Sequence, residues 1–252
     1  MKIIRPDDVE PTVNPNAMEH KDGSQVHRRI LSYPDGGPST IDVGYNQSSR
    51  ELDIAIPYAY NKHEYCYNIR GSVRAVNDGE TVEAGTGMFM WRPAGAATYR
   101  VSTADNYSSI CAFGPARTDG WSHRLPPEEV GKWDGDPAGK PQPQFRSLED
   151  VASSPFAGAR ASGTIIHRKM FDTPHMEVSH TIMEESASLE IAAHDREDVY
   201  WLESGAASVT SGDINLMMNA GEFLHVRPGE SIEALAVRGR SVLLRWSAPA
   251  AA

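Results

Sequence analysis

The sequence contains very little cysteine, no long apolar run and no cluster of basic residues. Only Cys66 and Cys111 are present in 252 residues. Two cysteines are too few for a disulfide framework, so we expect reduced thiols. No apolar run approaches the roughly 18 residues of a membrane span, and the net charge of −10 opposes nucleic-acid binding. These absences exclude membrane and nucleic-acid partners and leave a globular protein whose expected partner is a small molecule.

The sequence also has few signals for helices or for targeting. The opening segment MKIIRPDDVEPTVNP has acidic residues and prolines where a signal peptide would have an apolar stretch. We therefore expect no signal peptide and a cytoplasmic location. Only LPPEEVGKW and RSLEDVAS suggest a helical turn or two. Short segments rich in β-branched and aromatic residues, separated by turn signals such as NDGE (77–80), predict an all-β protein.

The sequence contains an internal repeat. Sliding the sequence by 134 positions places residues 60–95 on similar residues of the second half without a gap, as Glu64 and Asp198 illustrate. Further upstream the register shifts but the similarity persists. The matching segments are HEYCYNIRG (63–71) with EDVYWLESG (197–205), GMFMWRPAG (87–95) with GEFLHVRPG (221–229), VHRRIL (26–31) with IHRKMF (166–171), and RPDDVE (5–10) with SLEDVA (147–152).

The repeat predicts two β domains joined by a long connection. We expect a first barrel at residues 1–114, a linker rich in proline and glycine at 115–145, and a second barrel at 146–252. Two all-β units of roughly 110 residues are typical of sandwiches or jelly rolls.

A framework of a carboxylate, glycines and a proline recurs in both copies. In the first copy Glu64 lies seven residues before Gly71, and Gly87 precedes Pro93 and Gly95. This framework resembles the two-part signature of the cupin superfamily, so the chain looks like a bicupin with two tandem jelly-roll barrels. Segments such as WRPAGAATYRV further resemble the ureidoglycine aminohydrolase-like and ethanolamine-utilisation cupins. The resemblance implies a homodimer or a higher homo-oligomer.

The metal-ligand positions that the resemblance implies are largely substituted. Cupins of this pattern carry a His-x-His pair, a carboxylate and a late histidine. The first copy has Tyr58 and Tyr60 at the His-x-His positions and Thr98 at the late position, while the second has His194 with Ala192 and Ile232. Neutral hydroxyl groups are poor ligands for a divalent ion. We therefore expect no cofactor in the N-terminal barrel.

Alternation along strands nevertheless predicts a pocket in the first barrel. If Tyr60 points inward, Tyr58 does too, and Glu64 opens the next strand at the same depth. A desolvated carboxylate beside two phenols suits acid–base chemistry, with Glu64 as proton acceptor and the tyrosines as donors to an oxyanion. Four further residues are candidates for substrate binding: Trp91, Cys66, Thr98 and Arg100.

A purely structural alternative exists for the same residues. The tyrosines can be core aromatics with satisfied hydroxyl groups, and Glu64 can pair with an arginine such as Arg70, Arg74 or Arg100. Cys66 can be a small buried hydrophobe, since no histidine is clearly placed to activate it.

The second barrel offers a different set of polar side chains. Alternation places His194 and Asp198 inside, and His225 is the counterpart of Trp91. Two histidines and a carboxylate can bind one Mn²⁺, Fe²⁺ or Zn²⁺ ion. The alternative is a histidine–aspartate hydrogen bond in a structural barrel.

Together these patterns favour an enzyme of small-molecule metabolism. We expect lyase, isomerase or hydrolase chemistry on a small polar, carbonyl-bearing substrate in the N-terminal barrel. The alternatives are a bicupin that binds a small molecule without catalysis, and a metal-dependent oxygenase or hydrolase that uses the C-terminal barrel. Self-association is also expected because four methionines on strand faces would be awkward to expose: Met88, Met90, Met217 and Met218.

Overall fold

The computed structural model describes residues 1–12, 25–54, 57–77, 81–116, 125, 130 and 140–250. These residues are mostly in strands, and the described helical segments η1 (Pro6–Asp8), η3 (Tyr33–Asp35) and η4 (Leu148–Asp150) are short 3-10 turns. The all-β prediction is therefore confirmed. Within the described residues, no helix is both long enough and apolar enough to span a membrane.

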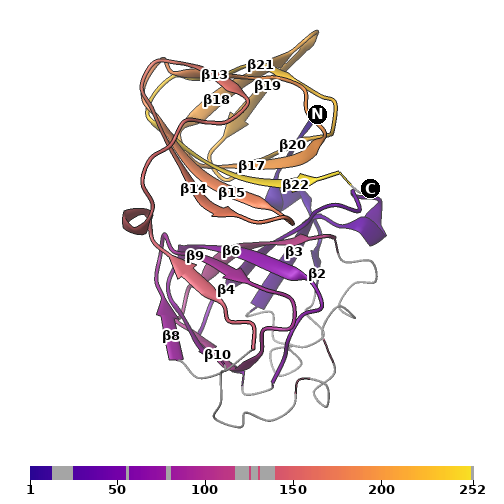
Figure 1. Ribbon diagram of the computed structural model, residues 1–252, viewed down its shortest axis with the longest axis vertical. Coiled ribbons are helices and arrows are strands. Elements are labelled where there is room, and N and C mark those ends of the chain that lie inside the picture. The colour runs from indigo at the N-terminus through magenta and orange to yellow at the C-terminus, as the bar shows by residue number, and fades with distance from the viewer. Residues whose placement is uncertain are drawn as a thin grey trace. The chain divides into compact units, whose positions relative to one another are not determined.

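The chain divides into two compact units (Figure 1). The first, called the N-terminal barrel, comprises Glu10–Leu148. Its described strands form antiparallel sheets in the orders β12-β9-β6-β11-β4-β3-β2 and β5-β10-β7-β8. The strands are β2 (Pro11–Thr12), β3 (Gln25–Leu31), β4 (Asp42–Ser48), β5 (Leu52–Ile54), β6 (His63–Arg70), β7 (Val73–Asn77), β8 (Thr81–Ala84), β9 (Phe89–Arg92), β10 (Thr98–Thr103), β11 (Ser108–Gly114) and β12 (Gln144–Arg146).

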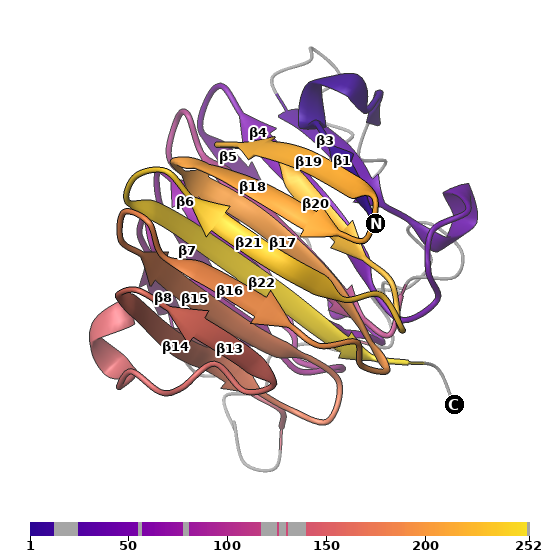
Figure 2. The ribbon, with the colours of Figure 1, turned by 90° about the horizontal axis from the view of Figure 1, so that it is seen from above.

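The second unit, called the C-terminal barrel, comprises Met1–Val9 and Glu149–Ala252. Its described strands form antiparallel sheets in the orders β1-β20-β17-β22-β15-β14 and β13-β16-β21-β18-β19, the latter visible in Figure 2. The strands are β1 (Lys2–Ile4), β13 (Ala159–Ser162), β14 (Ile165–Asp172), β15 (Glu177–Met183), β16 (Ser188–Ile191), β17 (Arg196–Ser204), β18 (Ala206–Ser211), β19 (Ile214–Asn219), β20 (Phe223–Val226), β21 (Ile232–Val237) and β22 (Ser241–Pro249).

Two short strands lie in a different barrel from the one their position in the sequence suggests. Met1–Val9, expected in the N-terminal barrel, group with the C-terminal one because β1 pairs with β20. β12 pairs with β9 and so extends the N-terminal barrel, although the predicted boundary divided it between the linker and the second domain. Most of the predicted linker 115–145 lies outside the described residues.

The repeat found in the sequence is a repeat of strands. Shifting β9 (Phe89–Arg92) by 134 positions gives β20 (Phe223–Val226). The glycines of the framework adopt left-handed backbone conformations in both copies, with φ of +76° at Gly71 and +90° at Gly205. A Cβ at Gly205 would also lie 2.1 Å from Ser241 Oγ, so only glycine fits there without movement.

The interior of the C-terminal barrel is filled with apolar side chains. The cluster includes Met183, Leu189, Tyr200, Leu202, Val209, Met218, Leu224, Val226, Ile232, Leu235 and Leu243, all buried. In the N-terminal barrel, Met88 and Met90 line a cavity. Of the four methionines expected on exposed faces, Met217 alone is exposed, at 45%. Self-association therefore stays a prediction, with less support from these methionines.

Candidate functional site

A cavity of about 140 Å³ lies within the N-terminal barrel. A buried water needs at least roughly 10–15 Å³ of such volume, so the cavity holds on the order of ten water-sized positions. That space fits a small metabolite. The polar part of its wall includes Asn46, Glu64, Asn68, Arg92, Tyr107 and Ser109.

Glu64 and Arg92 form a buried ion pair in this wall. They are paired residues on the neighbouring antiparallel strands β6 and β9, so both side chains point to the same face of the sheet. Arg92 Nη1 donates to Glu64 Oε2 at 2.5 Å, and the two residues are only 4% and 5% exposed. Their charges compensate each other away from water, which a lone buried carboxylate would not achieve.

The guanidinium of Arg92 retains donors that Glu64 does not use. Its Nε is buried and has no hydrogen-bond partner among the described residues. Its Nη2 lies 3.8 Å from Met90 Sδ, a weak acceptor. A guanidinium edge with spare donors in a cavity fits the two oxygens of a carboxylate.

Two tyrosines flank the same guanidinium. The Cζ atom of Arg92 lies 5.2 Å from the ring centroid of Tyr58 and 5.7 Å from that of Tyr60. Burial opposes the charge, but the adjacent Tyr58 and Glu64 raise the pKa of Arg92 above its ordinary value. Tyr58 belongs to the cavity wall and Tyr60 does not; Tyr60 instead packs edge-on against Phe113. The structure thus brings Tyr58, Tyr60 and Glu64 together around Arg92.

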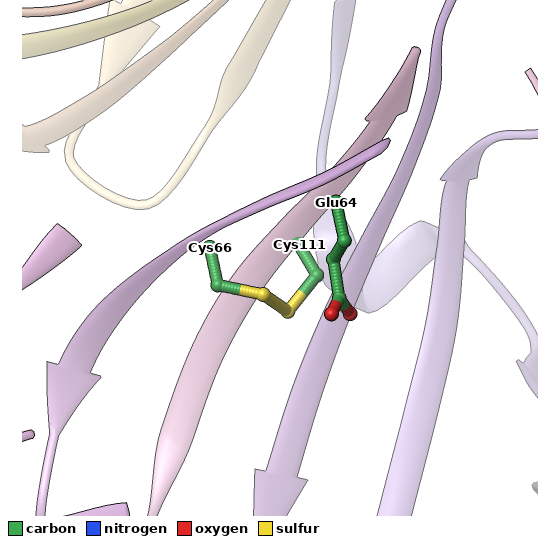
Figure 3. A group of neighbouring side chains, drawn as sticks. All are labelled: Glu64, Cys66 and Cys111. Carbon is green, nitrogen blue, oxygen red and sulfur yellow. A yellow bond between two sulfur atoms is a disulfide. The ribbon is translucent and has the colours of Figure 1, made fainter. Parts of the chain in front are cut away.

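Cys66 and Cys111 form a disulfide across β6 and β11 (Figure 3). The expectation of two free thiols is wrong, because these strands are neighbours and place the two cysteines directly opposite each other. Both cysteines line the cavity. The Glu64 carboxylate lies beside them, and a ligand atom from each of the three residues falls within 4.8 Å of the others.

The other three candidates for substrate binding lie away from this wall. Trp91 projects from the opposite face of β9 and stacks on Tyr65, with ring centroids 6.2 Å apart; Arg92 takes the inward place. Thr98 is buried and donates to Asn77 Oδ1 at 2.9 Å. Arg100 is exposed and forms a bidentate ion pair with Asp53.

The C-terminal barrel has a buried carboxylate of its own. Arg245 Nη2 donates to Asp198 Oδ1 at 3.1 Å, and Arg245 Nε lies 3.0 Å from Asp198 Oδ2 as part of the same ion pair. His194 Nε2 and the hydroxyl of Tyr200 lie 3.2 and 3.0 Å from Asp198 Oδ2. Burial acts to raise its pKa, but His194 and Arg245 hold the pKa of Asp198 below its ordinary value.

The predicted metal ligands of this barrel do not meet. Asp198 pairs with Val226 across β17 and β20, whereas His225 pairs with Val199 and so points to the opposite face. There His225 Nε2 contacts Glu197 Oε1. Only His194 and Asp198 are neighbours, and the cation of Arg245 occupies the carboxylate that an ion would need.

Comparisons with known proteins indicate the fold and little more. No family model and no curated protein matches the chain. A solved structure of oxalate decarboxylase from Bacillus subtilis at pH 4.6 matches with a TM-score of 0.68 and 12% identity, covering 99% of this chain and 76% of that chain. A second, on the substrate binding mode of oxalate decarboxylase, matches with a TM-score of 0.69 and 13% identity, covering 100% and 78%. A third concerns the Mn(II) centres of the Bacillus subtilis enzyme and matches at 0.68 and 13%, again covering 100% and 78%.

At this identity the likeness shows the fold alone. The predicted architecture of two tandem jelly-roll barrels is confirmed. The narrower resemblance to ureidoglycine aminohydrolase-like cupins is not tested by these structures and stays a prediction.

Proposed function

We propose that the N-terminal barrel is the active site of a bicupin enzyme that acts on a small carboxylic acid bearing a carbonyl group. The reaction is of the lyase, isomerase or hydrolase type. The observation that carries the proposal is the buried pair of Glu64 and Arg92 in a cavity wall, with donors of Arg92 still to spare.

Arg92 binds the substrate in this proposal. Nη2, now 3.8 Å from Met90 Sδ, donates to one oxygen of a carboxylate, and a small turn of the side chain brings the enclosed Nε to the other oxygen. The cavity of about 140 Å³ limits the substrate to a molecule of roughly ten heavy atoms or fewer, given the volume a water occupies. Arg92 therefore selects for charge, and the cavity selects for size.

Glu64 and Tyr58 carry the chemistry. A substrate carboxylate held at the other edge of the guanidinium leaves Arg92 Nη1 on Glu64 Oε2, and the second carboxylate oxygen of Glu64 is the proton acceptor. Tyr58 donates a hydrogen bond to the oxyanion that develops on the substrate carbonyl. Tyr60 packs against the ring of Tyr58, with centroids 5.4 Å apart, and positions it.

No step of this mechanism passes through a metal ion. One matching oxalate decarboxylase structure concerns Mn(II) centres, but the donors that the structure describes in the oxidised chain do not fit such a centre. Beside Glu64, the sulfur donors Cys66 and Cys111 are tied in a disulfide. In the other barrel Asp198 is bound by Arg245, and the predicted histidine ligand His225 faces away from Asp198. We assign the C-terminal barrel a structural role.

A second candidate function is binding without catalysis. It is favoured by the 2.5 Å contact between Arg92 and Glu64, which keeps the carboxylate occupied. A binding protein would take up the same class of ligand through Arg92 and release it unchanged.

The test is a titration that separates binding from turnover. Small mono- and dicarboxylic acids with a 2-oxo group are titrated by calorimetry, and proton NMR then follows each bound compound for conversion. The proposal expects at least one compound to bind and be converted by the wild type. The Glu64→Gln protein should bind it without conversion, and the Arg92→Gln protein should not bind it. Binding without conversion by the wild type across the panel would favour the non-catalytic function.

A further inference from the structure

The disulfide and Glu64 together form a group with metal-binding chemistry. Figure 3 shows the Glu64 carboxylate beside the bond between Cys66 and Cys111. We propose that reduction of this disulfide converts the cavity wall into a site for Zn²⁺ or a similar divalent ion, with Glu64, Cys66 and Cys111 as ligands. This inference does not depend on the proposed catalytic activity.

The strands already place the three ligands on one face. Glu64 and Cys66 are two residues apart on β6, so their side chains share a side of the strand. Cys111 lies directly opposite Cys66 on β11. The three ligand atoms lie within 4.8 Å of one another, and tetrahedral Zn²⁺ with bonds of about 2.3 Å to sulfur needs thiolates about 3.7 Å apart. After reduction the two sulfur atoms are no longer bonded and can move apart to the distance that the ion requires. A water molecule in the cavity supplies the fourth ligand.

Charge balance favours a divalent ion at this place. The oxidised wall is neutral, because Arg92 compensates Glu64. A divalent ion with two thiolates adds no net charge, so the occupied site is neutral as well. A monovalent ion would leave one negative charge uncompensated in a buried wall, which is costly. Arg92 donates to Oε2 of Glu64, so the second carboxylate oxygen can bind the ion. The positive charge of Arg92 also favours the thiolate form of the nearby cysteines.

The redox step requires an external dithiol. Its two thiols are oxidised to a disulfide, and the bond between Cys66 and Cys111 takes up the two electrons and two protons to give two thiols. The divalent ion then displaces both protons to solvent as the thiolates bind it. Cys111 is only partly buried and lines the cavity, so a small reductant can reach its sulfur.

Metal binding would change what the cavity can do. The ion occupies the Glu64 carboxylate, so the reduced, metal-bound form cannot use that group as a proton acceptor. A metal-free N-terminal barrel, expected from the sequence, stays a prediction for the oxidised form. Because cytosolic disulfides are usually transient or redox-sensing, such a site would couple the state of the cavity to the thiol balance of its compartment.

Cobalt is a suitable probe because thiolate-bound Co²⁺ absorbs in the near ultraviolet. The full chain is reduced with a phosphine, freed of reductant without oxygen, and titrated with Co²⁺ beside the oxidised chain. We expect one Co²⁺ per reduced chain with a thiolate-to-cobalt band, and no band in the oxidised chain. Cys66→Ser and Cys111→Ser should abolish the band. Glu64→Gln should weaken Co²⁺ binding by at least about tenfold, because even the loss of a residue that only hydrogen-bonds to a metal ligand typically lowers metal affinity by that factor.

Controls separate this site from other causes. Glu190→Gln makes the same change at an exposed carboxylate of the C-terminal barrel, 54% exposed in its side chain, and should leave the titration unchanged. If the cysteine variants fold poorly, Zn²⁺ should protect the thiols of the reduced wild type from alkylation. A reduced chain without a thiolate band, equal binding by the oxidised chain, or no loss in Glu64→Gln would overturn the proposal. Turnover by the oxidised, metal-free chain would be unaffected by any of these results.

Discussion

The two barrels place a buried carboxylate at the same point and neutralise it from different strands. Glu64 of β6 and Asp198 of β17 are equivalent under the shift of 134 positions. The arginine that binds Glu64 comes from β9, whereas the arginine that binds Asp198 comes from β22. The equivalent of Arg92 in the second barrel is Val226.

The choice of strand changes what lies beside the carboxylate. The same shift places Cys111 on Arg245 and Cys66 on Tyr200. In the C-terminal barrel these two large side chains project beside Asp198 and are buried. In the N-terminal barrel two small cysteines stand there, and the space beside them belongs to the cavity. The same strand arrangement thus places large polar side chains beside the carboxylate in the C-terminal barrel and a cavity beside it in the N-terminal barrel.

The largest expected effect is on turnover. Glu64→Gln keeps the size of the side chain but removes the proton acceptor, so the rate should fall by about 10²–10⁴-fold. Asp198→Asn makes the matching change in the other barrel and should alter the rate little. Steady-state kinetics on the compound found by titration measures both variants, and the opposite pattern would move the chemistry to the C-terminal barrel.

The next effect is on stability. Arg92→Met leaves the buried Glu64 without its partner, and such a loss typically costs about 3–5 kcal/mol. Arg245→Met should cost less, because Asp198 keeps its contacts with His194 and Tyr200. Amide hydrogen exchange measured in increasing urea reports the unfolding of each barrel separately, through β6 for the N-terminal barrel and β17 for the C-terminal barrel.

A double variant checks the cause of that loss. Glu64→Gln with Arg92→Met removes both charges and should recover much of the stability lost by Arg92→Met alone. No recovery would mean that the arginine contributes through packing rather than through its charge.

Reduction of the disulfide should cost somewhat less, typically about 2–4 kcal/mol. The bond between Cys66 and Cys111 closes a segment with a sequence separation of 45 residues, which limits the freedom of the unfolded chain. Only the N-terminal barrel should lose stability, as measured by thermal unfolding with and without a phosphine reductant. Equal losses in both barrels would contradict the assignment.

The effect that is smallest at neutral pH is a pH dependence of the C-terminal barrel. Burial lowers the pKa of His167 and that of His180 to about 4, against about 6.5 in an unfolded chain. Because the unfolded chain takes up these protons first, stability should fall as the pH drops from about 6.5 to 4. The slope should be up to about 1.4 kcal/mol per pH unit for each histidine. Denaturation across this pH range measures it, and His167→Gln with His180→Gln should flatten it.

The sequence was sufficient for most of the fold. The shift of 134 positions maps the strands of one copy onto those of the other, because the period-two pattern and the glycine turns are local signals. The exchange of β1 and β12 between the barrels was not predictable, since both strands are three residues long and carry no alternation.

The site was predictable only in part. Glu64 could be placed by alternation along β6, whereas Tyr58 lies outside the named strands, in an isolated bridge with Thr98. Arg92 was missed because the face that β9 presents depends on its register with β6, which the sequence does not contain. The pairing of Cys66 with Cys111 likewise depends on β6 and β11 being neighbours, a consequence of barrel topology. An arginine in the otherwise apolar segment MFMWRP was the one available signal, since a buried cation requires an acidic partner.

The most direct test of the central claim is a map of where a small 2-oxo acid binds. Backbone amide NMR spectra of the full, oxidised chain are recorded during titration with pyruvate and with oxaloacetate. The account predicts saturable shifts of residues on β6, β9 and β11 around Glu64 and Arg92, which disappear in the Arg92→Gln protein. Saturable shifts confined to β17 and β22 around Asp198 would contradict it.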